Sequence, residues 1–307
     1  MQECERSALL AVASRTAERA QEYAAKWNIP ESFGSYESLL EDPRIDVIYN
    51  SLPNDLHCEW TVKALRAGKH VLCEKPLAMS ADEAREMIAA CDRNGVLLME
   101  AFMYRLHPMW RAVLRLVEEG AIGELVAVDS VFSYFNDDPG NIRNIRDAGG
   151  GALYDIGCYP INVARMLFGG EPTAIQSSVR RDPAAGVDIV TSAILEFESG
   201  TATFLCSTRM EPDQRVDIYG TQGRLIVEIP FNIPPDRPTR VLQIEGGDPP
   251  IAPGMQVHEF ATADPYSVQA DEFSRAIRSG GVVPIPTSDA VGNLTVIDTI
   301  FARAGRS

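Results

Sequence analysis

Short apolar runs alternate regularly with helical segments over the first hundred residues of the chain. Each run is apolar along its whole length rather than at every second position. Such runs are typical of parallel strands buried on both faces, because helices cover both sides of the sheet. The alternation therefore predicts a doubly wound α/β domain over residues 1–105. The runs are 9–13, 47–49, 70–73 and 96–101, and the helical segments are 16–27, 35–40, 59–67 and 81–93.

The second half of the chain has a different pattern, in which longer strand-like segments follow one another and helical segments flank them. This pattern is typical of an α+β domain. We predict a second domain over 106–307 with a large, mostly antiparallel sheet that carries helices mostly on one face and is open on the other. The stretch 230–253 holds seven prolines, so we expect it to be irregular, with at most a short strand at 241–244. The predicted strands are 125–134, 174–180, 189–198, 201–207, 214–219 and 224–229, and the helices are 108–119, 152–167, 266–278 and 288–304.

Acidic residues outnumber basic ones by 43 to 28, which gives a net charge of −15 at pH 7. Such a surface repels phosphate backbones and anionic lipids, so we expect neither a nucleic-acid nor a membrane partner. No stretch approaches the roughly 18 consecutive apolar residues of a membrane span, and the polar, acidic start of the chain does not resemble a signal peptide; we expect a cytoplasmic protein. The six cysteines and four histidines are scattered without metal-ligand spacing, which predicts reduced thiols and no metal site.

One feature of a dinucleotide-binding domain is missing from the sequence. A Rossmann-type domain normally opens with a strand and the pattern G-x-G-x-x-G at a helix N-terminus, and this pattern occurs nowhere in the 307 residues. The chain starts with the segment that usually follows that turn. We expect a truncated N-terminus that lacks the first strand and the phosphate-binding turn; a genuine loss of cofactor binding is the alternative.

Four segments of the chain carry motifs. A Glu-Lys-Pro sequence follows a buried strand, and three glycines lead into a helix with the pattern D-x-x-x-Y. In this combination the chain resembles the glucose–fructose oxidoreductase/inositol dehydrogenase (Gfo/Idh/MocA) family of NAD(P)-dependent sugar and polyol oxidoreductases. Within the family it is most similar to the branch of NADP-dependent D-xylose 1-dehydrogenases and trans-dihydrodiol dehydrogenases. The segments are 52–57 (L-P-N-D-L-H), 71–76 (V-L-C-E-K-P), 100–108 (E-A-F-M-Y-R-L-H-P) and 149–159 (G-G-G-A-L-Y-D-I-G-C-Y).

The catalytic candidates are Lys75, Asp155 and Tyr159. Lys75 follows the carboxyl end of a strand, where open parallel sheets place their ligand crevice, and the resemblance implies that it is catalytic and precedes a cis-proline. Asp155, Tyr159 and Asn162 share one helix face by their spacing, behind glycines that permit close approach to the helix N-terminus. We expect the Lys75 ammonium to lower the phenol pKa of Tyr159 from its usual value of about 10, and Asp155 to orient the substrate. The alternative for Lys75 is an exposed lysine paired with Glu74. The alternative for Asp155 and Tyr159 is a helix face that is merely solvated.

Residues at the ends of the first strands are expected to contact the cofactor. Ser14 and Arg15 follow the first strand, at the point where the adenosine ribose is read. The Arg15 guanidinium suits the 2′-phosphate of NADP, so we expect NADP rather than NAD, with a surface arginine as the alternative. The contacts expected nearer the nicotinamide are Ser51, Leu52, Asn54, His57, Glu74, Lys75 and Arg105, with packing near Trp60 as the alternative for His57 and a salt bridge as the alternative for Arg105.

The resemblance implies an enzyme that transfers a hydride between NADP and C1 of an aldose such as xylose or glucose, with Lys75 and Tyr159 as the acid–base pair. Dihydrodiol oxidation or dicarbonyl reduction by the same residues is one alternative, and a truncated, non-catalytic sugar-binding relative is another. The expected ligand is a small sugar or diol. The resemblance also implies a homodimer or higher homo-oligomer through the open sheet, in which strands 189–198 and 201–207 are rich in apolar residues.

Overall fold

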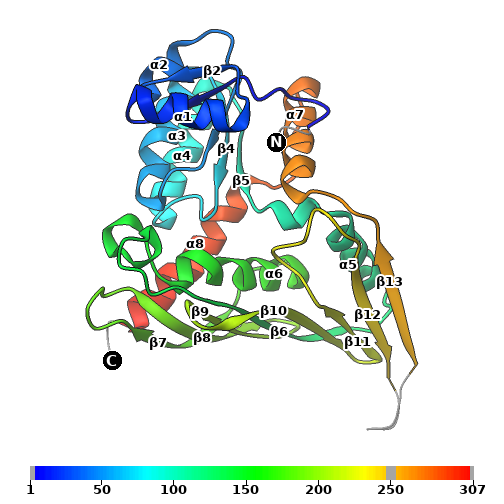
Figure 1. Cartoon of the computed structure of the whole chain (residues 1–307). Coiled ribbons are helices and arrows are strands. Elements are labelled where there is room, and N and C mark those ends of the chain that lie inside the picture. Colours follow the sequence, from blue (N-terminus) through cyan, green and yellow to red (C-terminus); the bar gives the residue numbers. More distant parts are fainter. Residues whose placement is uncertain (1–3, 247–253, 305–307) are drawn as a thin grey trace.

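The parallel strands of the first half form two groups in the computed structural model, which describes residues 4–246 and 254–304. Strand β1 pairs with β2, and β4 lies between β3 and β5. Strands β4 and β5 are almost entirely buried, whereas every residue of β1 is half-buried. The predicted doubly wound α/β arrangement is confirmed (Figure 1). The strands are β1 (Ala11–Ala13), β2 (Glu31–Phe33), β3 (Val47–Asn50), β4 (His70–Glu74) and β5 (Leu98–Ala101).

The helices of this half begin and end where local side chains satisfy their free backbone groups. At the start of α4, Ser80 Oγ accepts a hydrogen bond from Glu83 N at 3.2 Å, and Met79 N donates to Glu83 Oε2 at 2.9 Å. Gly95 ends α4 with a φ of +63°, a conformation in which glycine pays no steric penalty. The helices are α1 (Ala17–Trp27), α2 (Tyr36–Glu41), α3 (His57–Arg66) and α4 (Ala81–Asn94).

The second half forms one eight-stranded sheet with the strand order β13-β12-β11-β10-β6-β9-β8-β7. All neighbouring pairs are antiparallel except β6 and β9, so the sheet is mostly antiparallel as predicted. The proline-rich stretch contains a strand, β12, that is longer than expected. Strand β12 pairs with β13, which the sequence analysis did not predict. The strands are β6 (Leu125–Phe135), β7 (Ala174–Arg181), β8 (Asp188–Phe197), β9 (Gly200–Ser207), β10 (Arg209–Gly220), β11 (Gly223–Val227), β12 (Thr239–Glu245) and β13 (Met255–Phe260).

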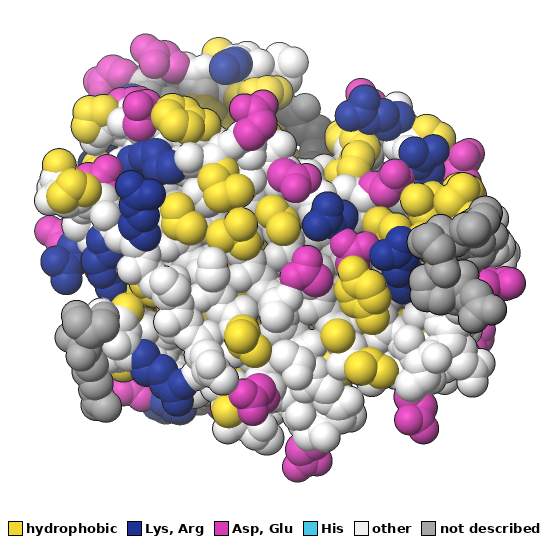
Figure 2. Space-filling view, turned by 90° about the horizontal axis from the view of Figure 1, so that it is seen from below, with side chains coloured by type: hydrophobic (Ala, Val, Ile, Leu, Met, Phe, Trp, Pro, Cys, Tyr) yellow, Lys and Arg dark blue, Asp and Glu magenta, His cyan; other side chains and the backbone are white. Residues whose placement is uncertain are grey.

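Helices α5 (Pro108–Glu118) and α6 (Cys158–Phe168) cover one face of this sheet, and its other face is open (Figure 1). The pleat turns most apolar residues of β8 and β9 toward the helices, among them Leu195 and Phe204. The open face is therefore more polar than the apolar content of these strands suggested. In Figure 2, which views it from below, neutral polar side chains and backbone occupy most of its centre. Among the described helices, none has the length and apolar character of a membrane span.

The last two helices return to the first half of the molecule. Helix α7 (Pro265–Ser279) stands beside β4 and β5, and α8 (Thr287–Ala304) packs against α4 (Figure 1). Ala81 N, at the start of α4, donates to Asp298 Oδ2 on α8 at 3.0 Å. The backbone N–H groups of Glu5 and Arg6 donate to the Asp271 carboxylate on α7. The last two helices therefore connect the second half of the chain to the first. The cavity described next lies between the two halves.

Candidate active site

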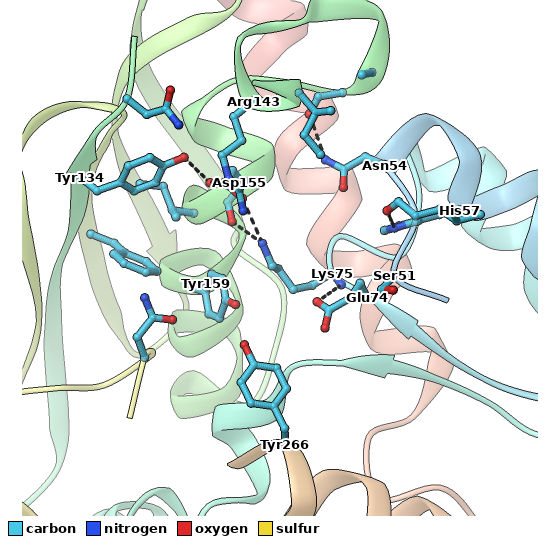
Figure 3. A pocket seen from close by; sticks show the side chains of 18 of the residues that line it. Ser51, Asn54, His57, Glu74, Lys75, Tyr134, Arg143, Asp155, Tyr159 and Tyr266 are labelled. Atoms are coloured by element: carbon cyan, nitrogen blue, oxygen red, sulfur yellow. Dashed lines mark hydrogen bonds and ion pairs between the residues drawn. The ribbon is translucent and has the colours of Figure 1, made fainter. Parts of the chain in front are cut away.

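A cavity of about 570 Å³ opens between the carboxyl ends of β3 and β4 on one side and β6 and α6 on the other (Figure 3). Lys75 enters it from the first half, and Asp155 and Tyr159 enter it from the second. All three predicted catalytic residues are therefore in one cavity. The lining residues are Tyr49, Ser51, Leu52, Asn54, His57, Glu74, Lys75, Phe132, Tyr134, Asn136, Ile142, Arg143, Ala148, Gly149, Asp155, Ile156, Tyr159, Asn232 and Tyr266.

Lys75 is held at the end of β4 and bonded to the start of the helix that faces it. Its Nζ donates to the backbone oxygen of Asp155 at 2.7 Å and lies 3.4 Å from Asp155 Oδ1. The Lys75–Pro76 peptide is cis, as the resemblance implied. Burial opposes the charge of Lys75, but the acidic groups around it, of which Asp155 contributes most, together outweigh burial and raise the pKa of Lys75. The ammonium is thus protonated over the whole neutral range.

The Asp155 carboxylate is the centre of the polar cluster. Its Oδ2 accepts hydrogen bonds from the Tyr134 hydroxyl and, at 2.9 Å, from Arg143 Nε, while Oδ1 faces Lys75. Burial alone would raise the pKa of Asp155, but the Lys75 and Arg143 cations outweigh it, so the pKa lies below its usual value. Because Oδ2 is occupied twice and Oδ1 only by a long contact, Oδ1 keeps room to accept a hydrogen bond from a hydroxyl in the cavity.

Tyr159 forms the floor of the cavity and is only 4% exposed. Its ring centroid lies 5.2 Å from Lys75 Nζ, and its hydroxyl donates to Met103 Sδ at 3.7 Å. Burial raises the pKa of Tyr159 well above that of a free tyrosine. This differs from the sequence-based expectation of a lowered pKa, because the Lys75 ammonium is engaged by Asp155 and the ring is enclosed by aromatic neighbours. These neighbours are Phe102, Tyr104, Phe132 and Phe231.

The helix that carries Asp155 and Tyr159 begins with a π-helical turn, Leu153–Gly157, before α6. A π turn holds more residues than an α turn, so it rotates the following residues around the axis relative to Asp155. Asn162 does not line the cavity, and its side chain bonds to Tyr104 and Asp289. Of the three residues expected on one helix face, Asp155 and Tyr159 line the cavity and Asn162 does not.

The glycines that precede this turn are required by the chain itself. A Cβ on Gly151, where φ is +120°, would lie 2.1 Å from Asp188 Oδ1, and Asp188 Oδ2 accepts a hydrogen bond from Leu153 N at 2.7 Å. A Cβ on Gly149 would lie 2.5 Å from Met79 Sδ. The group that approaches this helix N-terminus is therefore the Asp188 carboxylate, which caps it. No motif marked Asp188 in the sequence.

Most residues predicted to contact the nicotinamide line the first-half wall of the cavity, namely Ser51, Leu52, Asn54, His57 and Glu74. The ring nitrogens of His57 lie 2.9 Å from Pro76 O and 2.8 Å from Leu52 O, so this buried side chain ties together the turns after β3 and β4. Asn54 Nδ2 donates to Gly149 O at 2.9 Å across the cavity mouth. Glu74 accepts hydrogen bonds from the Tyr49 hydroxyl and from Lys75 N.

Three predicted cofactor contacts lie outside this cavity. Arg105 Nη1 forms an ion pair with Asp289 Oδ2 at 2.7 Å, which matches the structural alternative considered for this residue. Ser14 follows β1 and donates its backbone N–H to Phe33 O, and the side chain of Arg15 is exposed. The structure thus brings Lys75, Asp155 and Tyr159 together with five of the predicted cofactor contacts, and it does not bring Ser14, Arg15 and Arg105 to them.

Sequence reasoning did not single out several polar residues of the cavity. Tyr134 comes from β6 and Tyr266 from the first turn of α7, where Figure 3 shows its hydroxyl directed toward Tyr159 and Glu74. Asn136 and Asn232 follow β6 and β11. Tyr134, Asn232 and Tyr266 reach the cavity from elements far apart in the chain, so no local pattern could have grouped them. Within 4–246 and 254–304, no group of three or more His, Cys, Asp or Glu side chains is placed to hold a metal ion.

The first-half wall suits the nicotinamide end of a dinucleotide. It stands at the carboxyl ends of parallel strands, where doubly wound domains bind such ligands, and it offers the hydroxyl of Ser51, the amide of Asn54 and the carboxylate of Glu74. The exposed guanidinium of Arg15 suits a phosphate near the end of β1.

Comparisons with known proteins agree with this geometry. The model of the Gfo/Idh/MocA oxidoreductase family with an NAD-binding Rossmann fold matches residues 1–102, and the model of the Gfo/Idh/MocA C-terminal domain matches residues 110–226. A D-xylose 1-dehydrogenase (NADP(+)) of Haloferax volcanii is 36% identical over 96% of this chain and 89% of its own length. A trans-1,2-dihydrobenzene-1,2-diol dehydrogenase of Xenopus laevis is 39% identical over 72% of this chain and 67% of its own length.

A solved structure extends the similarity to the whole fold. The aldose-aldose oxidoreductase of Caulobacter crescentus in complex with glycerol superposes with a TM-score of 0.89 at 29% identity, covering 99% of this chain and 91% of that one. Both family models, the sequence relatives and this structure give the same assignment. The chain belongs to the Gfo/Idh/MocA family and is an oxidoreductase with an NAD(P)-binding Rossmann domain.

Proposed function

We propose that this enzyme oxidises C1 of a cyclic aldose such as xylose or glucose with NADP as hydride acceptor, or reduces the corresponding lactone. The observation that carries the proposal is the convergence of Lys75, Asp155 and Tyr159 on one cavity from opposite halves of the chain. A lysine, a carboxylate and a phenol present donors and an acceptor to neighbouring hydroxyl groups, which is what a sugar offers. The similarity to a D-xylose dehydrogenase and to an aldose oxidoreductase supports the same substrate class.

In the proposed mechanism Tyr159 exchanges a proton with the oxygen on C1. Because its pKa is raised, the phenol keeps its proton at neutral pH and can give it to the oxygen during reduction. Oxidation is the reverse and starts from the tyrosinate: Tyr159, having first lost its proton to water, takes up the hydroxyl proton as the C–H bond breaks and the hydride would pass to NADP. The Lys75 ammonium donates a hydrogen bond to the same oxygen and stabilises negative charge that develops on it. Asp155 accepts a hydrogen bond from a neighbouring sugar hydroxyl and fixes the position of the ring.

NADP supplies the hydride acceptor when it is bound. Ser51, Leu52, Asn54, His57, Glu74 and Lys75 would hold its nicotinamide end, and Ser14 and Arg15 its adenosine end. The absence of an acid after β1 and the presence of Arg15 support NADP over NAD as the preferred cofactor.

We also propose that two copies of the chain associate through the open face of the eight-stranded sheet. The face is uncovered across its middle, and a hollow of about 430 Å³ lies on it, lined partly by Ser192, Ile194, Thr203 and Leu205. Mostly neutral side chains and backbone occupy its centre, which favours burial of that part against a second copy. Static light scattering at micromolar concentration should give twice the mass of one chain, and a monomer mass would contradict this.

The six free cysteines support a reducing, cytoplasmic environment.

The function is tested by following NADPH formation with sugars and diols, and NADPH consumption with dicarbonyls. The expected result is turnover with xylose or glucose and little or none with trans-dihydrodiols. Preference for a dihydrodiol, or activity only in the reduction of dicarbonyls, would replace the aldose by one of the alternative substrates. Sugar binding without any turnover, in a preparation shown to bind NADP, would indicate a non-catalytic binding protein.

A further inference from the structure

One motif of the sequence contributes no side chain to the cavity. Residues 100–106 comprise the last two residues of β5, Phe102 and the 3₁₀ helix Met103–Leu106, and none of them lines the cavity wall. The segment lies behind the cavity, where it joins the two halves of the chain. Glu100 and Tyr104 are at most 1% exposed. Burial of a polar group costs free energy unless the group is hydrogen-bonded, and a buried carboxyl also tends to lose its charge. The partners of Glu100 and Tyr104 therefore matter.

At one end the segment holds the turn that carries Lys75. Glu100 pairs with Cys73 in the β4–β5 ladder, and its Oε1 accepts a hydrogen bond from Leu77 N at 2.7 Å. Leu77 follows Lys75 by two residues, so this bond fixes the backbone just beyond the lysine. Burial raises the pKa of Glu100 to about 8, so the carboxyl is mostly neutral at pH 7. Its Oε2 has no partner within the described part of the chain.

At the other end the same segment holds the helix that carries Tyr159. The Tyr104 hydroxyl donates to Asn162 Oδ1 at 2.6 Å, one turn beyond Tyr159 on α6. Met103 Sδ accepts the hydrogen bond of the Tyr159 hydroxyl, and the rings of Tyr104 and Tyr159 lie 5.8 Å apart. The Arg105–Asp289 and Asn162–Asp289 bonds attach both elements to α8.

We propose that residues 100–106 set the distance between Lys75 and Tyr159, with Glu100 and Tyr104 as positioning residues. The two catalytic candidates come from different halves of the chain, and this buried segment is bonded to the support of each. A misplacement of about 1 Å between reacting groups can cost about 10²-fold in rate. The effect on turnover rests on the proposed function; the effect on geometry does not.

The test uses four variants of the whole chain. Glu100→Leu removes the acceptor for Leu77 N, Glu100→Gln keeps an oxygen there, and Tyr104→Phe removes only the hydroxyl that binds Asn162. Thr239→Val is the matched control, because its buried hydroxyl donates to Met109 Sδ at 3.0 Å and the residue lines no part of the cavity. For each, kcat and KM for the aldose and a crystal structure are determined.

We expect Glu100→Leu to lower kcat by about 10²-fold and Tyr104→Phe by about 10-fold, with KM changed by less than about threefold. Glu100→Gln should restore most of the rate. The crystal structures should show Lys75 Nζ displaced from Asp155 O in Glu100→Leu, and the Tyr159 hydroxyl displaced from Met103 Sδ in Tyr104→Phe. Unchanged positions, or an equal loss of kcat in Thr239→Val, would overturn the proposal. If Glu100→Leu does not fold, Tyr104→Phe carries the test. If the parent enzyme oxidises no sugar, the proposed function fails and the crystal structures alone decide the inference.

Discussion

The two ends of the expected cofactor crevice differ in how firmly the fold holds their side chains. At the catalytic end, the side chains of Lys75 and Asp155 are 14% and 12% exposed and bonded to each other. Their supports are β4, which is paired on both sides, and a helix capped by Asp188. At the adenosine end, Arg15 is exposed and follows β1, a half-buried strand with a described pairing to β2 only.

The difference separates two requirements of an oxidoreductase. Proton transfer needs donor and acceptor within hydrogen-bond reach in a fixed orientation, so its groups stand where buried elements converge. Recognition of a phosphate needs mainly a cation within reach, which a long, exposed side chain can supply. Substitutions at the catalytic end should therefore have larger effects on rate than any at the adenosine end, and small effects on cofactor choice.

The largest effect is expected at Tyr159. Tyr159→Phe keeps the ring in its aromatic surroundings and removes the hydroxyl, so kcat for aldose oxidation should fall by about 10²–10⁴-fold. The melting temperature should change by only a few degrees, since the lost hydrogen bond is a long one to sulfur. Near-normal kcat would show that proton transfer passes through another group, such as Lys75 or His57.

A smaller effect is expected at the adenosine end. Arg15→Asp removes a charge-assisted contact to the 2′-phosphate, so the ratio of kcat/KM with NADP to that with NAD should fall by about 10–10²-fold. The kcat at saturating cofactor should stay close to that of the parent enzyme. Arg19→Asp, one turn further along the exposed side of α1, is the matched control. The same ratio in the parent and in Arg15→Asp would contradict a contact between Arg15 and the 2′-phosphate.

Substitution of one valine in β4 and one in β1 compares how firmly these two strands are packed. Val71 in β4 is fully buried, whereas Val12 in β1 is half-buried. Val71→Ala should lower the free energy of unfolding by about 2–3 kcal/mol and Val12→Ala by less than about 1 kcal/mol, because only the first leaves a cavity in a packed core. Chemical denaturation of both variants measures this difference, and equal losses would mean that β1 is as firmly packed as β4.

The smallest effect is expected in the acid dependence of stability. The pKa of Asp155 is lowered in the folded state, so its carboxylate stabilises the fold above the unfolded pKa of about 3.9 and loses that contribution as pH falls through the folded pKa. The free energy of unfolding should therefore decrease below about pH 4–5 less steeply in Asp155→Asn than in the parent. Asp82→Asn, at a side chain that is 93% exposed, should leave the slope unchanged. If the free energy of unfolding of Asp155→Asn decreased with falling pH as steeply as that of the parent, the pKa of Asp155 would not be lowered in the folded state.

The sequence predicts the parts of this molecule that are encoded locally. Continuous apolar runs identified β3 and β4, and the glycine-led D-x-x-x-Y pattern identified Asp155 and Tyr159, because each signal lies within a dozen residues. Strand β13 was not predicted, since pairing with β12 rather than its own composition stabilises it. Tyr134 and Tyr266 reach the cavity only through the tertiary fold.

The chemistry of Tyr159 shows the same limit. Proximity of a lysine in the family motif suggested a lowered pKa for the phenol, but the sign of the shift depends on burial and on which group engages the lysine. Neither is visible in the sequence. The π-helical turn at Leu153–Gly157 is likewise not visible in the sequence.

The central claim is that Lys75 and Tyr159 act as one catalytic unit. The most direct test is a double-mutant cycle on kcat for aldose oxidation with Lys75→Ala, Tyr159→Phe and the double variant. If the two groups serve one proton transfer, each single variant should lose about 10²–10⁴-fold and the double variant should be barely slower than either. Multiplication of the two losses in the double variant would contradict the claim, because it would show that the lysine and the tyrosine act independently.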